Sequence, residues 1–217
     1  MSNITVFTTV FGNTDPLHEP ASAGGARFVC FTDQQIRSSK WEIVQMPPQA
    51  APTRAARMMK TLSHKTVDTE WSLWIDANFT LMVEPEKLLK YGEFVNFMHR
   101  DRTRISDEAR EIIRLRKAMP DATMRQLAAY QADGFDTKAS PQRALSCNGV
   151  ILRHHTPQVV ALNELWAAEI DKHTLRDQMS LDYCAWKLGF EISRWPGLHD
   201  RNPYFQHKHY RRPTNDY

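Results

Sequence analysis

The sequence predicts an α/β domain with a largely parallel central sheet flanked by helices, because β-branched and aromatic segments alternate with helix-like segments along the chain. The strand-like segments are nearly continuous in apolar residues, as strands covered on both faces are. Short polar turns such as GNTD and FTD follow them. With 217 residues, 41% of them hydrophobic, we expect one domain spanning 1–217.

The first half of the chain predicts four strands and a helix. In order, we expect strands at 3–11, 26–33 and 40–46, a helix at 52–67 and a strand at 71–83. Apolar residues form one face of the helix, and Arg57, Lys60 and His64 form the opposite face. Taken alone, this basic stripe is typical of a solvent-exposed helix face.

The second half continues the alternation. We expect a short helix at 83–93, a strand at 94–101, helices at 106–119 and 121–132, a strand at 144–153, helices at 156–173 and 174–189, and a short strand at 190–195. Ser106, Thr156 and Thr174 are the expected helix caps, and Gly189 ends the last helix. Asp177 lies three residues after Thr174, which fits a capping pattern.

Composition and simple motifs exclude several classes of protein. The net charge is +3, and Cys30, Cys147 and Cys184 have no metal-binding spacing, which favours reduced thiols. No signal peptide and no apolar run of roughly 20 residues is evident, so we expect a cytoplasmic location, or the host cytoplasm for a viral protein. GxGxxG, P-loop, GxSxG and HExxH patterns are missing, which argues against Rossmann, kinase, serine-hydrolase and zincin classes.

Polar residues follow several of the predicted strands. In such sheets ligands bind beyond the carboxyl ends of the strands, so the ends FGNTD, FTD, IDAN and HRD are where a site is expected. Asp76 and Asn78 interrupt the apolar segment 71–83, and side chains at i and i+2 of a strand point the same way. Such a pair suits a divalent cation. A structural Asx turn explains it equally well.

Other candidate residues also have two interpretations. Asn148 and Gly149 indicate either a bulge or a close backbone approach to a ligand. The terminal histidines His199, His207 and His209, with Lys208 among them, form either an exposed basic tail or part of a metal and anion site.

The order of these segments resembles that of GT-A glycosyltransferases, in particular glycosyltransferase family 8 and a related glycosyltransferase-like family of plants and microbes. The resemblance is carried by VFTTVFGNTDPL, FVCFTD, RAARMMKTLSHK, WSLWIDANFTL, CNGVILRHHTPQVV, LWAAEIDKHTLRDQMSLDYCAWK and the closing His-rich segment. It implies a GT-A-like fold for nucleotide-diphospho-sugar transfer, with residues 196–217 closing over the donor site.

The resemblance also implies roles for individual residues. WIDAN takes the place of the family's DxD motif, with Asn78 where family 8 has its second aspartate. The implied metal ligands, for Mn²⁺ or Mg²⁺, are Asp76, Asn78 and His207 or His209. The implied donor contacts are Thr8, Thr9, Val10 and Phe11 at the base, Asp33 near the ribose, Arg57, Lys60, Asp76 and Lys208 at the diphosphate, and Asn148 and Gly149 at the sugar. Asp177 and Gln178 are implied beside the reacting sugar as the catalytic pair.

The resemblance implies metal-dependent transfer of a hexosyl or pentosyl group from a nucleotide sugar, expected to be a UDP-sugar, with retention of configuration. The expected acceptor is a saccharide or lipid precursor, or a hydroxymethylated pyrimidine in DNA. In the DNA case the basic residues Arg100, Arg102, Arg104, Lys208, Arg211 and Arg212 would track phosphates.

Two alternative functions stay open at this point. One is a metal-dependent phosphodiesterase or nuclease that uses Asp76, His207 and His209. The other is a non-catalytic nucleic-acid-binding module with a degenerate site.

Overall fold

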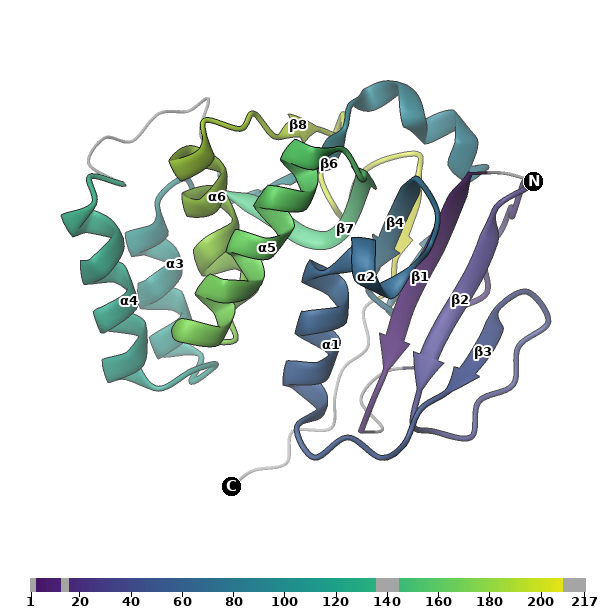
Figure 1. Ribbon diagram of the computed structural model, residues 1–217, viewed down its shortest axis with the longest axis horizontal. Helices are drawn as coiled ribbons and strands as arrows, with labels where there is room; N and C mark the ends of the chain where they lie inside the picture. Colours follow the sequence, from purple (N-terminus) through teal and green to yellow (C-terminus); the bar gives the residue numbers. More distant parts are fainter. Residues whose placement is uncertain (1–2, 13–15, 136–144, 209–217) are drawn as a thin grey trace.

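The structure is a computed structural model that describes residues 3–12, 16–135 and 145–208. Its strands are β1 (Ile4–Val10), β2 (Arg27–Thr32), β3 (Glu42–Gln45), β4 (Trp71–Ile75), β5 (Phe79–Leu81), β6 (Phe94–Met98), β7 (Ser146–His154), β8 (Ser193–Arg194) and β9 (Phe205–His207). Its helices are α1 (Pro52–Thr61), α2 (Ser63–Thr66), the 3₁₀ helix η1 (Pro85–Tyr91), α3 (Ile105–Arg114), α4 (Pro120–Ala132), α5 (Pro157–Lys172) and α6 (Asp177–Leu188). Figure 1 shows how these elements surround one main sheet.

The main sheet has the strand order β3-β2-β1-β4-β7-β6-β8. All of its pairings are parallel except those of β7, which runs antiparallel to both β4 and β6. The predicted fold class, an α/β domain with a largely parallel sheet, is therefore confirmed. A separate two-stranded sheet joins β5 to β9.

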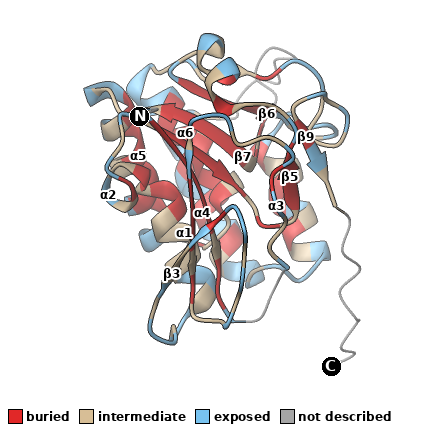
Figure 2. Ribbon diagram, turned by 90° about the vertical axis from the view of Figure 1, so that its right-hand side faces the viewer, coloured by how far each residue is buried: buried red, intermediate tan, exposed pale blue. Residues whose placement is uncertain are grey.

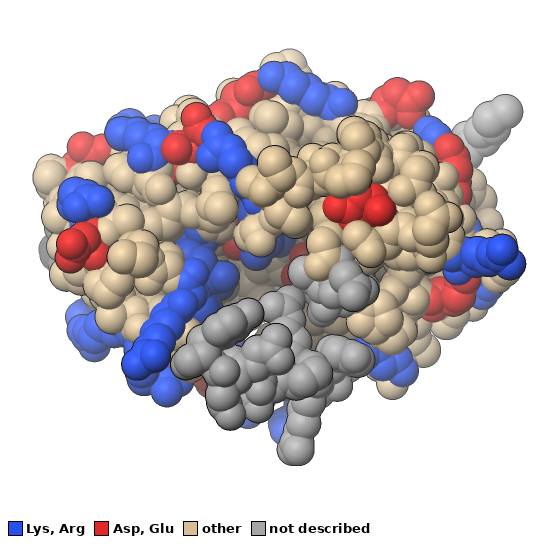
Figure 3. All heavy atoms as spheres, turned by 90° about the horizontal axis from the view of Figure 1, so that it is seen from below, with Lys and Arg blue, Asp and Glu red and all other residues tan. Residues whose placement is uncertain are grey.

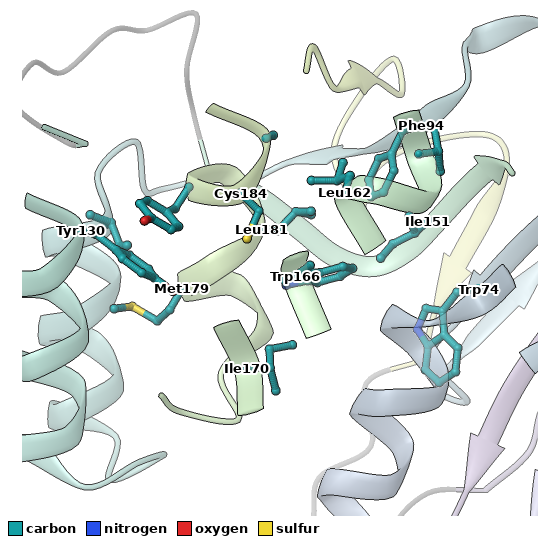
Figure 4. Packing of buried hydrophobic residues seen from close by; sticks show 14 of the residues in the cluster. Trp74, Phe94, Tyr130, Ile151, Leu162, Trp166, Ile170, Met179, Leu181 and Cys184 are labelled. Carbon is teal, nitrogen blue, oxygen red and sulfur yellow. The ribbon is translucent and has the colours of Figure 1, made fainter. Parts of the chain in front are cut away.

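The two faces of the sheet are buried in two apolar clusters. One cluster packs Trp166 and Leu162 of α5 against Ile151 of β7, as Figure 4 shows. The other places Leu88 of η1 and Phe205 of β9 against the opposite face. Because both faces are covered, the inner strands β1, β4, β6 and β7 are buried along most of their length, which explains their continuous apolar sequences, whereas the short edge strands β3 and β8 are not buried (Figure 2).

The helix boundaries agree only in part with the predicted caps. Thr156 caps α5 by accepting a hydrogen bond from the backbone N–H of Val159, and Gly189 ends α6 in the left-handed conformation, as predicted. Ser106 and Thr174 are not caps, since α3 follows Arg104 and α6 follows Arg176. The hydroxyl of Thr174 instead donates to Gln126.

Two segments that were expected to be continuous are divided. The segment 71–83 forms β4 in the main sheet and β5 in the small sheet, and residues 76–78 are the turn between them. The backbone N–H of Phe79 donates to the carbonyl of Asp76 across this turn. The segment 52–67 is divided into α1 and α2 at Leu62, whose φ and ψ of −91° and 49° are not helical.

Candidate functional site

The carboxyl ends of β1, β2 and β4 lie together, because the three strands are parallel neighbours. The arrowheads of β1 and β2 mark this side at the lower edge of Figure 1. Figure 3 views the molecule from this side, and basic side chains border a hollow near its centre with acidic atoms inside. We call the residues described below at these strand ends the carboxyl-edge site.

Asp76 follows the last residue of β4. Its side chain is 37% exposed, although the apolar residues on either side of it in the segment 71–83 predict a buried strand. Its Oδ1 accepts a hydrogen bond of 2.7 Å from the indole N–H of Trp74 and lies 3.5 Å from the Nζ of Lys60. Its Oδ2 has no hydrogen-bond donor among the described residues. One carboxylate oxygen is therefore fixed while the other is available to a ligand.

Lys60 connects Asp76 to Asp177. The Lys60 Nζ lies 2.9 Å from Asp177 Oδ2, and Arg57 approaches the same oxygen at 3.3 Å. Lys60 is only 1% exposed, so the interpretation of the basic stripe as a solvent-exposed face is wrong for this residue. His64, the third member of the stripe, lies beyond the break at Leu62 and pairs with Glu164 instead.

Asp177 and the two cations Arg57 and Lys60 stabilise each other in their charged forms. Burial alone would raise the pKa of Asp177, but the charges of Arg57 and Lys60 outweigh it and hold this pKa below its ordinary value. Asp177 in turn raises the pKa of Arg57. Asp177 is therefore an ion-paired anion, and the interpretation of its side chain as a helix cap with Thr174 is wrong.

Asn78 and His207 meet across the small sheet. The Nδ2 of Asn78 lies 3.2 Å from the Nε2 of His207, and the backbone carbonyl of Asn78 accepts from the N–H of Lys208. The Oδ1 of Asn78 is buried without a hydrogen-bond partner in the described structure. Pairing of β5 with β9 thus places part of the segment 196–217 beside Asp76, whereas His209, Arg211 and Arg212 lie outside the described residues.

Asn148 and Gly149 line the same region from β7. The carbonyl of Gly149 accepts from the N–H of Asp76 at 2.8 Å. A Cβ atom at this glycine would lie 2.8 Å from the ring of Phe79 and 3.4 Å from Asp76 Oδ2. The Nδ2 of Asn148 is buried without a partner among the described residues. The pairing of β6 with β7 shifts register between Asn96 and Phe97, opposite residues 148–150, so the predicted bulge is confirmed, whereas a backbone approach to a ligand stays a prediction.

The predicted base and ribose residues lie at the ends of β1 and β2. Thr8, Val10 and Phe11 are buried, and Thr9 is half-buried. Asp33 accepts hydrogen bonds from the side chain of Gln34 and from the N–H of Gly12, and both lower its pKa. Its carboxylate holds the turn after β1 in place.

Gln178 does not join the group around Asp76. Its Nε2 donates to Glu108 of α3 at 3.4 Å, and Glu108 forms an ion pair with Arg102. The predicted catalytic pair is therefore divided, with Asp177 directed to the cations of α1 and Gln178 to α3. Arg102, and Arg100 in its pair with Asp200, are already bonded to carboxylates, which weakens their expected role as phosphate contacts.

Two residues that the sequence reasoning did not select contribute to this region. Trp74 donates to Asp76, and its ring lies below the Lys60 ammonium, 5.4 Å from the centroid. Its position two residues before Asp76 was the available signal. Asn96 of β6 donates to Asn148 at 3.2 Å, and nothing in its local sequence indicates this contact.

The residues present fit a divalent cation, although no group of three or more His, Cys, Asp or Glu side chains suited to a metal occurs among the described residues. The fit depends on oxygen ligands: Asp76 Oδ2, and the buried, unpartnered Oδ1 of Asn78. His207 lies against Asn78.

The family model and the α/β sheet together give the class of the protein: a glycosyltransferase-like domain whose fold fits the GT-A type. The family model of the TOD1/MUCI70 glycosyltransferase-like domain matches residues 26–209, and the chain belongs to this family. The predicted glycosyltransferase class is therefore confirmed. The matching family is TOD1/MUCI70 and not glycosyltransferase family 8.

The chain is also similar to the probable hexosyltransferase MUCI70 of Arabidopsis thaliana, with 26% identity over 186 residues. The alignment covers 78% of this chain and 32% of that relative. The chain therefore spans about a third of the length of the curated relative that it matches.

Proposed function

We propose that the chain transfers a hexosyl group from a nucleotide sugar, with a UDP-sugar as the expected donor, to an acceptor hydroxyl. The observation that carries the proposal is the chain of contacts Asp76–Lys60–Asp177–Arg57 at the carboxyl edge of the sheet. Ligands of α/β sheets bind at this edge, and the family to which the chain belongs is glycosyltransferase-like.

Charge balance supports a site for a cation and a diphosphate. Two carboxylates and two basic side chains offset one another at the site, so a dication and the diphosphate of a donor would add charges that also largely cancel. Asp76 and Asn78, with His207 beside them, would hold Mn²⁺ or Mg²⁺, which would act as a Lewis acid toward the diphosphate.

Lys60 and Arg57 would stabilise the departing diphosphate. Cleavage of the bond between sugar and phosphate leaves negative charge on the departing diphosphate, and preorganised cations stabilise such charge most strongly in the transition state. Asp177 keeps both cations in place. Asn148 and Gly149 would lie beside the donor sugar, next to Asp76. Retention of configuration, as in family 8, is the stereochemistry that we expect.

Thermal stability and donor hydrolysis test this proposal. We expect UDP with Mn²⁺ to raise the melting temperature, and slow hydrolysis of one nucleotide sugar to be detectable by mass spectrometry. Asp76→Ala should abolish both effects. Asp68→Ala is the matched control, because Asp68 is an exposed acid whose one ion pair among the described residues is with Arg27 at 3.5 Å. Equal donor hydrolysis by the Asp76→Ala protein and by the unaltered chain would refute the site.

The acceptor is proposed to be a saccharide or a lipid-linked precursor. Hydroxymethylated DNA is the weaker proposal, because Arg100 and Arg102 already pair with Asp200 and Glu108. Assays of the donor identified above with simple glycosides, lipid-linked sugars and hydroxymethylated DNA would distinguish these acceptors.

A further inference from the structure

The turn between α3 and α4 carries a concentration of exposed apolar side chains. Met119 is 73% exposed, and Leu115 and Met124 are also exposed. The other large apolar side chains that are exposed in the described structure are Met82 and Met98, which lie apart from each other in the chain, and Trp186 and Leu188, both on α6. Single exposed apolar residues are ordinary, but several within ten residues indicate a surface that contacts something apolar.

Cations surround these apolar residues. Arg110 and Arg114 pair with acids of α3, at 3.2 Å and 2.6 Å. Arg116, Lys117 and Arg125 form no ion pair with the described residues, and the acids nearest to them in sequence are Asp121 and Glu111, of which Glu111 already pairs with Arg114. We call the set Leu115, Arg116, Lys117, Met119 and Arg125 the α3–α4 tip. It combines positive charge in excess with exposed apolar side chains.

The backbone holds Arg116 at the apex of the tip. The N–H of Lys117 donates to the carbonyl of Ile112 and the N–H of Arg116 to that of Ile113, so α3 ends in a Schellman motif. Arg116 has a φ of 51°, a conformation that favours glycine, and it is the one non-glycine residue with positive φ in the described chain. A long cationic side chain thus occupies a position where glycine is usual, and a functional reason is the natural explanation.

The tip lies on the same side of the molecule as the carboxyl-edge site. In Figure 1 the connection between α3 and α4 lies at the lower edge, toward which β1 and β2 also point. Burial lowers the pKa of Lys117, the charge of Arg176 at the start of α6 lowers it further, and Glu108 and Glu111 of α3 oppose this change.

We propose that the α3–α4 tip docks the protein on an anionic lipid surface, with Leu115 and Met119 inserted among the headgroups and with Arg116, Lys117 and Arg125 bound to their charged groups. Surfaces of this composition bind bilayers through buried apolar area together with attraction to anionic lipids. No helix in the described part of the chain is long and apolar enough to cross a membrane, which is consistent with peripheral docking.

Other occupants fit the tip less well. A nucleic acid would contact the cations and leave Met119 without an apolar partner. A second copy that presented the same tip would bring like charges together. Docking on a bilayer would turn the carboxyl-edge site toward the membrane surface and so favour a lipid-linked acceptor, a consequence that rests on the proposed function, whereas the docking itself does not.

Vesicle sedimentation of the full chain tests the proposal. We expect binding to vesicles of phosphatidylcholine mixed with phosphatidylglycerol, little binding to phosphatidylcholine alone, and loss of binding at high salt. Arg116→Gly should lower the partition coefficient about fivefold, the effect of removing one cation near an anionic surface. The same change should raise the melting temperature, because glycine relieves the positive φ. Loss of binding by a more stable protein cannot be attributed to misfolding.

An apolar variant and its control complete the experiment. Met119→Ser should lower binding about tenfold, which is the expected effect of removing a buried methionine side chain. Leu188→Ser is the matched control, since Leu188 is 45% exposed at the end of α6 and should leave binding unchanged. Absence of vesicle binding, or equal effects of the two serine variants, would overturn the proposal. So would binding of duplex DNA or self-association through Met119 in the absence of vesicle binding.

Discussion

Two polar clusters lie at opposite ends of β4 and β7, and they differ in whether their buried cations are paired with carboxylates. The carboxyl-edge site keeps Lys60 and Asp177 charged, because each lies within 3 Å of an opposite charge. The cluster at the amino end of β4, which we call the amino-edge cluster, consists of Arg153, His155, Ser63, Ser72 and Asn163. Its buried Arg153 forms hydrogen bonds with the carbonyl of Thr61 and with Asn163, and no carboxylate contacts it among the described residues.

The pKa values express the same difference. Burial lowers the pKa of Arg153 to about 9, and burial and the charge of Arg153 lower the pKa of His155 to about 4. At the carboxyl edge, in contrast, the pKa of Asp177 is held low by two cations against the effect of burial. At the amino edge Arg153 lacks a carboxylate partner among the described residues and His155 is held neutral, whereas the carboxyl edge pairs its buried charges next to a half-exposed carboxylate, an arrangement suited to the proposed charged ligand.

The largest effect is expected from Lys60→Met. This change leaves Asp177 buried with Arg57 as its remaining cation, and breaking a buried pair in this way costs about 3–5 kcal/mol of unfolding free energy. Chemical denaturation measures this loss, and donor hydrolysis should also disappear. Lys60→Arg should recover part of the stability. A Lys60→Met protein of unchanged stability would show that the pair contributes nothing.

A smaller effect is expected from pH at the amino edge. His155 has an ordinary pKa of 6.5 when unfolded and of about 4 when folded, so the unfolded chain binds more protons between these values. The unfolding free energy should therefore fall as pH is lowered from about 6.5 to about 4. The Nε2 of His155 contacts Ser63 and Ser72, and its Nδ1 contacts the carbonyl of Thr69, a hydrogen bond that offsets part of the fall in the pKa.

His155→Gln isolates this contribution. The pKa of His99 is also lowered to about 4, so the wild-type chain alone would not identify the histidine responsible. Denaturation of both proteins across this pH range should show a fall smaller by on the order of 1–2 kcal/mol in the variant, a figure reduced for the partial exposure of the ring. Parallel pH profiles for the two proteins would contradict the assignment.

The smallest effect is expected from Arg153→Met. Replacement of a buried cation that lacks a carboxylate by an apolar side chain should change the unfolding free energy by no more than about 1–2 kcal/mol, in either direction. Donor binding should be unchanged, because Arg153 contacts α1 only through the carbonyl of Thr61. A loss as large as that of Lys60→Met would remove the distinction between the two clusters.

The sequence was sufficient for the fold class and for most elements, because strand and helix patterns are local. It was insufficient where tertiary contacts decide the structure. Helical periodicity placed Lys60 on an exposed face, but Asp76 and Asp177 come from distant segments and bury it. Asp76 and Asn78 in the apolar run 71–83 allowed a turn as one interpretation, but nothing local indicated that the chain passes to a second sheet there.

The residues of the candidate site were likewise only partly predictable from the sequence. The positions of Asp76, Asn78 and Gly149 followed from motif order, and the structure brings them together with His207. The sequence did not predict that Asp177 and Gln178 would contact different partners. Adjacent residues of a helix point in different directions, and only packing decides which of them faces the site. Asn96 had no local signal at all.

Anomalous scattering from a crystal that holds Mn²⁺ and UDP tests the central claim most directly. We predict a manganese peak in contact with Asp76 Oδ2 and Asn78 Oδ1, with the diphosphate directed toward Lys60. A peak elsewhere, together with an Asp76 side chain still bonded only to Trp74 and Lys60, would contradict the proposed site.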